Sequence, residues 1–108
     1  MPLYNSKSEK VEVKAIGLPD YYLEQARDRI QENFRISGKG YAGKIAMVEF
    51  TISANGTISD VRIVQSAGSA ELDQLAKSAL LETARLAPLP DSTGLQQVRS
   101  RVTFNFDR

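Results

Sequence analysis

Apolar and polar residues alternate along two long stretches of the chain, the pattern of a β-strand with one buried face. The first stretch runs from Lys44 to Ser53 and the second from Val98 to Phe106. A shorter alternation from Lys10 to Ile16 indicates a short edge strand. The polar face of the last strand consists of Arg99, Arg101, Thr103 and Asn105.

Asn55-Gly56 follows the first long strand and predicts a β-hairpin. We expect a two-residue type I′ turn, which requires φ > 0 at both central positions. This turn fixes the register, and in that register apolar residues face apolar residues and opposite charges meet. The predicted cross-strand pairs are Phe50 with Val61, Val48 with Ile63, Glu49 with Arg62 and Thr51 with Asp60.

Two segments have apolar residues at helical spacing. The first helix is expected to open with Pro19 in its first turn and to end near Arg35 or Ile36. The second is expected to start after a Ser69 N-cap and to stop at Pro88 and Pro90. The predicted core consists of Val48, Phe50, Ile52, Val61, Ile63, Val102, Phe104 and Phe106 from the strands and Leu23, Ile30, Phe34, Leu72, Leu75, Ala76 and Leu80 from the helices.

The predicted fold class is α+β, in the order (β)αββαβ, with two helices packed on one face of a three-stranded antiparallel sheet. We expect residues 1–17 to form an N-terminal arm that contains the short strand if it forms, and residues 18–108 to form one domain. No apolar run is long enough to span a bilayer, and no signal-peptide core is present, so we expect targeting information to lie outside this sequence.

Composition argues against an enzyme. The 108 residues include no histidine and no cysteine, which removes the usual general base and thiolate chemistry. The carboxylates of Asp60, Glu71 and Asp73 fall in the hairpin and at a helix start, so we expect neither catalysis nor a metal or other cofactor. A net charge of +1 gives no basic footprint for nucleic acid. The glycine-rich stretch 37–41 follows a helix and precedes a strand, the reverse of a phosphate-binding loop.

Four segments follow one another along the chain: GKIAMVEFTI from Gly43, NGTISDV from Asn55, QSAG from Gln65 with a following Leu-Asp pair, and APLP from Ala87. In this order they resemble the TonB/TolA C-terminal domain family. The resemblance covers about residues 21–107. The order LPDYY near Leu18, and the absence of an aromatic residue before Pro88, depart from TonB-type domains and leave the choice between TonB-type and TolA-type open.

The resemblance implies a periplasmic protein-binding domain of an envelope energy transducer, tethered to the inner membrane in the full-length protein. Its partners would be outer-membrane receptors or Tol-Pal proteins, with an inner-membrane motor complex reached through an N-terminal part. The domain would be a monomer or a strand-exchanged dimer. The alternative is a cytoplasmic ferredoxin-like binding module for nucleic acid or protein. That alternative would need exposed aromatic residues on the central strands.

We expect the last strand to border the sheet and to accept an extended partner segment as an added strand. Arg99 and Arg101 would then favour acidic partners. Two alternatives stay open: that the polar side of this strand is a solvated face, and that the arm around Val11 to Ile16 already covers the edge. The expected partner-binding residues are Val98, Arg99, Ser100, Arg101, Val102, Thr103, Phe104 and Asn105. Tyr4, Tyr21, Tyr22 and Tyr41 are either packing residues or interface anchors.

Overall fold

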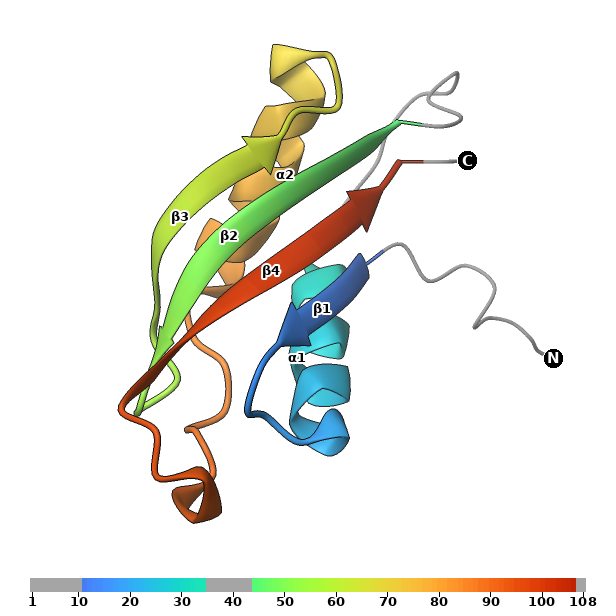
Figure 1. Ribbon diagram of the computed structural model, residues 1–108. Coiled ribbons are helices and arrows are strands. Elements are labelled where there is room, and N and C mark those ends of the chain that lie inside the picture. Colours follow the sequence, from blue (N-terminus) through green and yellow to red (C-terminus); the bar gives the residue numbers. More distant parts are fainter. Residues whose placement is uncertain (1–10, 35–43, 107–108) are drawn as a thin grey trace, which may run out of the picture.

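The computed structural model describes residues 11–34 and 44–106 (Figure 1). The prediction of an α+β domain in the order βαββαβ is confirmed, and the short first strand forms, so the sheet has four strands. The elements are β1 (Val11–Ala15), α1 (Asp20–Glu32), β2 (Ile45–Ser53), β3 (Ile58–Gln65), α2 (Ala70–Thr83) and β4 (Gln97–Asn105).

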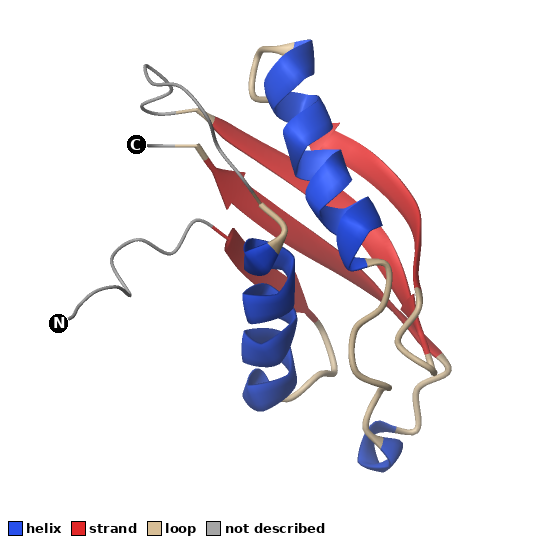
Figure 2. Ribbon diagram, turned by 180° about the vertical axis from the view of Figure 1, so that it is seen from behind, coloured by secondary structure: helices blue, strands red, loops and turns tan. Residues whose placement is uncertain are grey.

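The strand order is β1-β4-β2-β3, and every neighbouring pair is antiparallel. Both helices lie on one face of the sheet, as Figure 2 shows from the helix side. The other face is uncovered by any helix or strand of the described residues. Because β4 pairs with β1 on one side and with β2 on the other, it lies inside the sheet, and the prediction that it borders the sheet is wrong. The two strands at the edges are β1 and β3.

The core lies between the sheet and the two helices, as the alternation predicts. Phe50, Phe104 and Phe106 are fully buried, and Phe34 packs against the latter two with ring centroids 4.8 and 5.2 Å away. Most of the predicted core residues are buried, whereas Leu23, Val61, Ile63 and Leu75 are partly buried against the same cluster.

The hairpin turn differs from the prediction. Gly56 has φ +91°, as expected, but Asn55 is not among the residues with positive φ. The Gly56 N–H donates to the Ser53 carbonyl at 2.8 Å, and the Ser53 N–H donates to the Thr57 carbonyl at 3.0 Å. The loop therefore has three residues, Ala54 to Gly56, with glycine at the left-handed position.

The longer loop shifts the register next to the turn, and the irregularity between Glu49 and Thr51 restores the predicted pairs beyond it. Val48 pairs with Ile63 and Glu49 with Arg62, as predicted. The predicted pairs of Phe50 with Val61 and Thr51 with Asp60 are wrong, because the register shifts there and Thr51 pairs with Ser59. Asp60 takes a left-handed conformation with φ +57°, which marks a β-bulge.

Both helices end earlier than predicted. Helix α1 ends at Glu32 with Asn33 as C-cap, so Phe34 packs from the segment after the helix. Helix α2 begins after the predicted Ser69 cap, whose hydroxyl accepts from the Leu72 N–H at 3.5 Å. It ends at Thr83, well before Pro88, because the backbone of Ala84 leaves the helical conformation with a positive φ of +58°.

The segment that follows α2, residues 84–89, runs beside the hairpin loop. Its Ala84 carbonyl accepts from the Ile58 N–H, and its Leu86 and Leu89 N–H groups donate to the Gly56 and Ala54 carbonyls. The Tyr22 hydroxyl donates to the Ala87 carbonyl at 2.5 Å and joins α1 to the same segment. Tyr22 is thus a packing residue whose burial raises the pKa of its hydroxyl, whereas Tyr21 is 57% exposed. Tyr4, Tyr41 and the 37–41 stretch lie outside the described residues.

Candidate functional site

The eight predicted partner-binding residues lie along β4 and divide between its two faces. Val98, Ser100, Val102 and Phe104 point into the core and are buried. On the open face, Arg99 and Arg101 are exposed, whereas Thr103 and Asn105 are half-buried. This division follows from the alternation along the strand, since successive side chains point to opposite faces.

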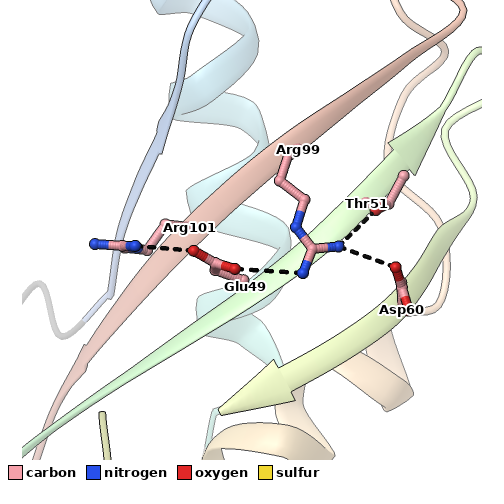
Figure 3. A network of polar contacts seen from close by, with 5 residues as sticks. All are labelled: Glu49, Thr51, Asp60, Arg99 and Arg101. Carbon is pink, nitrogen blue, oxygen red and sulfur yellow. Dashed lines mark hydrogen bonds and ion pairs between the residues drawn. The ribbon is translucent and has the colours of Figure 1, made fainter. Parts of the chain in front are cut away.

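A polar network crosses the open face from β4 to β3 (Figure 3). Arg99 Nη1 donates to Thr51 Oγ1 at 3.0 Å and to Asp60 Oδ2 at 3.1 Å, and its Nη2 lies 3.3 Å from Glu49 Oε1. Arg101 Nη2 donates to Glu49 Oε2 at 2.8 Å. Each oxygen of the Glu49 carboxylate therefore has its own arginine. The sequence predicted the charges on this face but not that Glu49 would join the two arginines.

The two arginines act on the titration of Glu49. Hydrogen bonds from Arg101 and Arg99 stabilise the ionised carboxylate, so they lower the pKa of Glu49 below its ordinary value of 4.5. The carboxylate is consequently ionised at neutral pH and holds both guanidinium groups in place over the sheet.

One edge of β4 pairs with β2, and β1 covers five residues of the opposite edge. The register pairs Val11 with Phe104 at one end and Ala15 with Ser100 at the other. Beyond Ala15 the chain turns at Ile16 and Gly17, so β1 does not continue along Gln97 to Arg99. The alternative in which the arm covers this edge is thus the arrangement found, and it leaves the first three residues of β4 without a β1 partner.

A shallow hollow of about 400 Å³ lies at the end of β1 on the open face. Ile16, beside it, is 95% exposed. Ser100 is also among the residues around the hollow, although its side chain points to the core side, where its buried hydroxyl has no hydrogen-bond partner within the described residues. The lining of the hollow includes three cationic side chains and the carboxylate of Glu49, and the carboxylates of Glu12 and Asp60 pair with two of the same cations from outside the lining. Its lining residues are Lys14, Ala15, Ile16, Glu49, Arg99, Ser100 and Arg101.

Sequence reasoning missed the contribution of Lys14. The register places Lys14 directly opposite Arg101, so two cations face each other across β1 and β4. The nearest carboxylate to Lys14 among the ion pairs of the described residues is Glu12, two positions away on the same strand, at 3.9 Å. The alternation predicted β1, but only the pairing of β1 with β4 brings these two cations together.

A second groove, of about 560 Å³, follows the outer side of β1. Helix α1 forms its opposite wall through Asp20, Leu23, Glu24 and Arg27. Ile45, Thr103 and Asn105 complete its lining, so the groove lies beside the start of β1 and reaches β2 and β4.

The remaining candidate groups have structural roles. Asp73 Oδ1 accepts from the Ala67 N–H at 2.8 Å, and Asp73 Oδ2 accepts from the Ser66 hydroxyl, which orders the loop before α2. Residues 11–34 and 44–106 contain no group of acidic residues that could hold a metal ion. Neither described helix combines the length and apolarity that a membrane crossing requires.

Comparisons with known proteins agree with this architecture. Residues 19–106 match the TonB C terminal family. The chain is 36% identical over 55 residues to protein TonB of Helicobacter pylori, a match that covers 51% of this chain and 19% of that protein. The chain therefore spans about a fifth of the length of that relative.

Two solved structures share the fold. The C-terminal domain of Helicobacter pylori TonB, residues 179–285, superposes with a TM-score of 0.68 at 22% identity and 86% coverage of both chains. A TolAIII domain bound to a peptide from the N-terminus of TolB superposes with a TM-score of 0.58 at 21% identity, covering 72% of this chain and 68% of the other.

The family match extends over nearly the whole domain and includes the hairpin, the second helix and β4. Domains of this family are non-enzymatic energy transducers of the cell envelope and are typically periplasmic, which confirms the prediction that the chain is not an enzyme. The chain belongs to the TonB C-terminal domain family.

Proposed function

We propose that this domain binds an extended segment of an envelope protein by adding it as a strand beside β4. The proposed contact residues are Val98, Arg99, Ser100, Arg101, Val102, Thr103, Phe104 and Asn105. The observation that carries the proposal is the edge of Gln97 to Arg99 that faces away from β2: it continues past the end of β1 without a β1 partner, and Arg99 at its inner end borders the hollow. An extended peptide can use such backbone groups for affinity, and neighbouring side chains for selectivity.

The partners we propose are the N-terminal segment of an outer-membrane receptor or a component of the Tol-Pal system. The TolAIII domain with a similar fold is described as bound to a TolB peptide, which supports the second class. We also propose a periplasmic location, a tether to the inner membrane and contact with an inner-membrane motor complex through a segment N-terminal to this sequence. Family membership supports these assignments.

Chemical-shift mapping on the isotope-labelled chain tests the proposal. The probes are synthetic peptides from the N-termini of TolB and of outer-membrane receptors of the same bacterium, and scrambled peptides serve as controls. We expect the largest amide shifts at residues 97–105 and in β1. Shifts confined to α1 and α2, or equal shifts with scrambled peptides, would contradict the proposal.

A charge variant sharpens the same measurement. Arg101→Gln removes the cation that points toward β1 but keeps a polar side chain, and it should weaken binding of an acidic peptide severalfold, an effect that salt reduces. Lys77→Gln on α2 is the matched control, because it removes one positive charge away from β4. Proline at Arg101 is unsuitable, since β4 lies inside the sheet and would lose a ladder hydrogen bond.

A further inference from the structure

We infer that β1 is a built-in competitor for the partner strand: it occupies the position of the partner beside β4, and a partner with an acidic residue opposite Arg101 displaces it. The inference rests on the proposed function. It adds the position of the partner, the charge that the partner carries, and the displacement of β1 that gives the partner access to β4. Three features of the described residues lead to it: the length of β1, the way it is held, and the cations between β1 and β4.

The first feature is length. Strand β4 runs over nine residues, Gln97–Asn105, but β1 pairs with only the five from Ser100 to Phe104. The turn at Ile16 and Gly17 prevents β1 from following β4 any further. A separate peptide has no such turn, so it can pair with Gln97 to Arg99 as well. Displacement of β1 therefore exchanges a shorter ladder for a longer one.

The second feature is how β1 is held: it packs against α1 on the core side and has few polar contacts on the open face. Only Val11 and Val13 are buried, at 3% and 7% exposure, and Ala15 is partly buried. On the open face, the side chains of Glu12 and Lys14 are 66% and 76% exposed and pair with each other along the strand. By contrast, Glu49 on β2 is bound by both Arg99 and Arg101 of β4. Within the part of the chain that the structure describes, the hydrogen bonds and ion pairs that join β2, β3 and β4 on this face thus come from Glu49, Thr51, Asp60, Arg99 and Arg101, and none comes from β1.

The third feature is the pair of like charges. Lys14 faces Arg101 directly, and like charges in this position destabilise a strand pair. Arg101 reaches Glu49 through Nη2 while 52% of its side chain stays exposed, so it remains accessible from the β1 side. A partner with Asp or Glu at the position of Lys14 replaces a repulsive pair with an attractive one. The partner segment we expect has small or β-branched apolar residues at the positions of Val11 and Val13, and an acid at the position of Lys14.

A disulfide lock tests displacement in the full chain. Glu12 and Thr103 are opposite each other on the open face, and the protein has no cysteine of its own, so Glu12→Cys with Thr103→Cys creates a single reversible crosslink. The probes are two synthetic peptides, one with the sequence of residues 10–16 and one with Glu in place of Lys14. A second crosslinked variant, Met47→Cys with Gln65→Cys between β2 and β3, is the matched control.

We expect the reduced lock variant to bind the Glu peptide about fivefold more tightly than the Lys peptide, the range of a cross-strand charge pair. Oxidation should weaken binding of both peptides at least tenfold, whereas oxidation of the control variant should change nothing. Equal binding by the oxidised and reduced forms would overturn the inference, because the peptide would then be adding to the outer edge of β1 or elsewhere.

A variant of the intact chain gives a second readout that needs no ligand. Lys14→Glu places an acid opposite Arg101, so it should slow amide hydrogen exchange in β1 about fivefold. Lys77→Glu makes the same charge change on α2 and should leave exchange in β1 unaltered. Unchanged exchange in Lys14→Glu would overturn the charge argument.

The two proposals fail in distinguishable ways. If peptides from TolB and from receptors bind the oxidised lock variant as well as the reduced one, partner binding stands and displacement of β1 fails. If those peptides bind neither form, the proposed function fails, and the inference fails with it.

Discussion

The two edges of the sheet are built differently. At the β3 edge the fold itself limits pairing: the strand is irregular, Asp60 sits in a left-handed bulge, and the segment after α2 bonds to Gly56 and Ile58. At the β1 edge, a five-residue strand lies against β4 with two buried valines and a pair of like charges. Bulges and covering segments are the usual means of blocking an exposed edge.

The difference indicates where a partner can enter. Removing the cover from β3 would require separating the hairpin loop from the segment after α2, which contributes Leu86 and Leu89 to the core. Removing β1 exposes β4 without disturbing β2, β3 or α2, because β1 pairs with β4 alone. The β3 edge therefore contributes to the stability of the domain, whereas the β1 edge is the one at which we propose that a partner strand replaces β1.

The largest expected effect comes from disrupting the β3 side at Gly56. A Cβ at this position would lie 2.1 Å from the Leu86 carbonyl oxygen, and the φ of +91° disfavours any side chain. Strain and backbone displacement together predict that Gly56→Val lowers the free energy of unfolding by about 3–5 kcal/mol. Chemical denaturation measures this loss.

Gly94 supplies the matched control for Gly56. It also has positive φ, +68°, but nothing lies within 4 Å of its added Cβ. Gly94→Val should therefore cost about 1–2 kcal/mol, from strain alone. Equal losses in the two variants would show that the contact between Gly56 and the segment after α2 does not stabilise the β3 edge.

Val13→Ala examines the β1 edge. Removing the buried side chain costs about 1–2 kcal/mol of β1 docking. Because β1 can open by itself, we expect faster amide exchange in β1, by about tenfold, and little change in the global unfolding midpoint. Val48→Ala at the centre of the sheet should instead lower the midpoint. A fall of the same size in both midpoints would mean that β1 and the central strands unfold together.

The Glu49 network predicts an acid sensitivity that is smaller than either effect above. The folded-state pKa of Glu49 is below its ordinary value of 4.5, so its contribution to stability is complete above that pH. The contribution is lost as the pH falls through the lowered pKa. Glu49→Gln should therefore flatten part of the decline in melting temperature on acidification below pH 4.5. A parallel decline in both proteins would exclude Glu49 as a source of acid sensitivity.

The smallest effect is expected at Asp60. Asn tolerates the left-handed conformation, so Asp60→Asn keeps the bulge and removes only the ion pair with Arg99. The Asp60 side chain is 75% exposed. The unfolding free energy should change by less than about 0.5 kcal/mol, and the difference should vanish at high salt. A larger, salt-independent loss would show that the Asp60 carboxylate holds the bulge itself.

Local sequence signals predicted the elements well, and their failures have identifiable physical causes. Asn55-Gly56 predicted a hairpin and the positive φ of Gly56, but not the third loop residue, because that depends on hydrogen bonds to the segment after α2. Pro88 and Pro90 suggested a helix reaching to them, whereas the positive φ of Ala84 ends α2 at Thr83. Turn type and helix end were both decided by contacts between segments distant in sequence.

The candidate site was predicted only in part, for a similar reason. Alternation along Val98 to Phe106 assigned Arg99 and Arg101 to the open face without any tertiary information. It could not predict that Glu49 would bind both arginines or that Lys14 would face Arg101. Those contacts depend on which strands become neighbours, and hydrophobic periodicity within one strand carries no information about its neighbour.

The sequence by itself determined the order of helices and strands, the buried face of each strand and the absence of the usual catalytic groups. Each of these follows from residue type and spacing along a short segment. Only the tertiary structure decided that β4 lies inside the sheet and that β1 occupies the side of β4 where a partner was expected. Strand order has this character because it is fixed by the packing of both helices and all four strands together, and several orders satisfy the same local pattern.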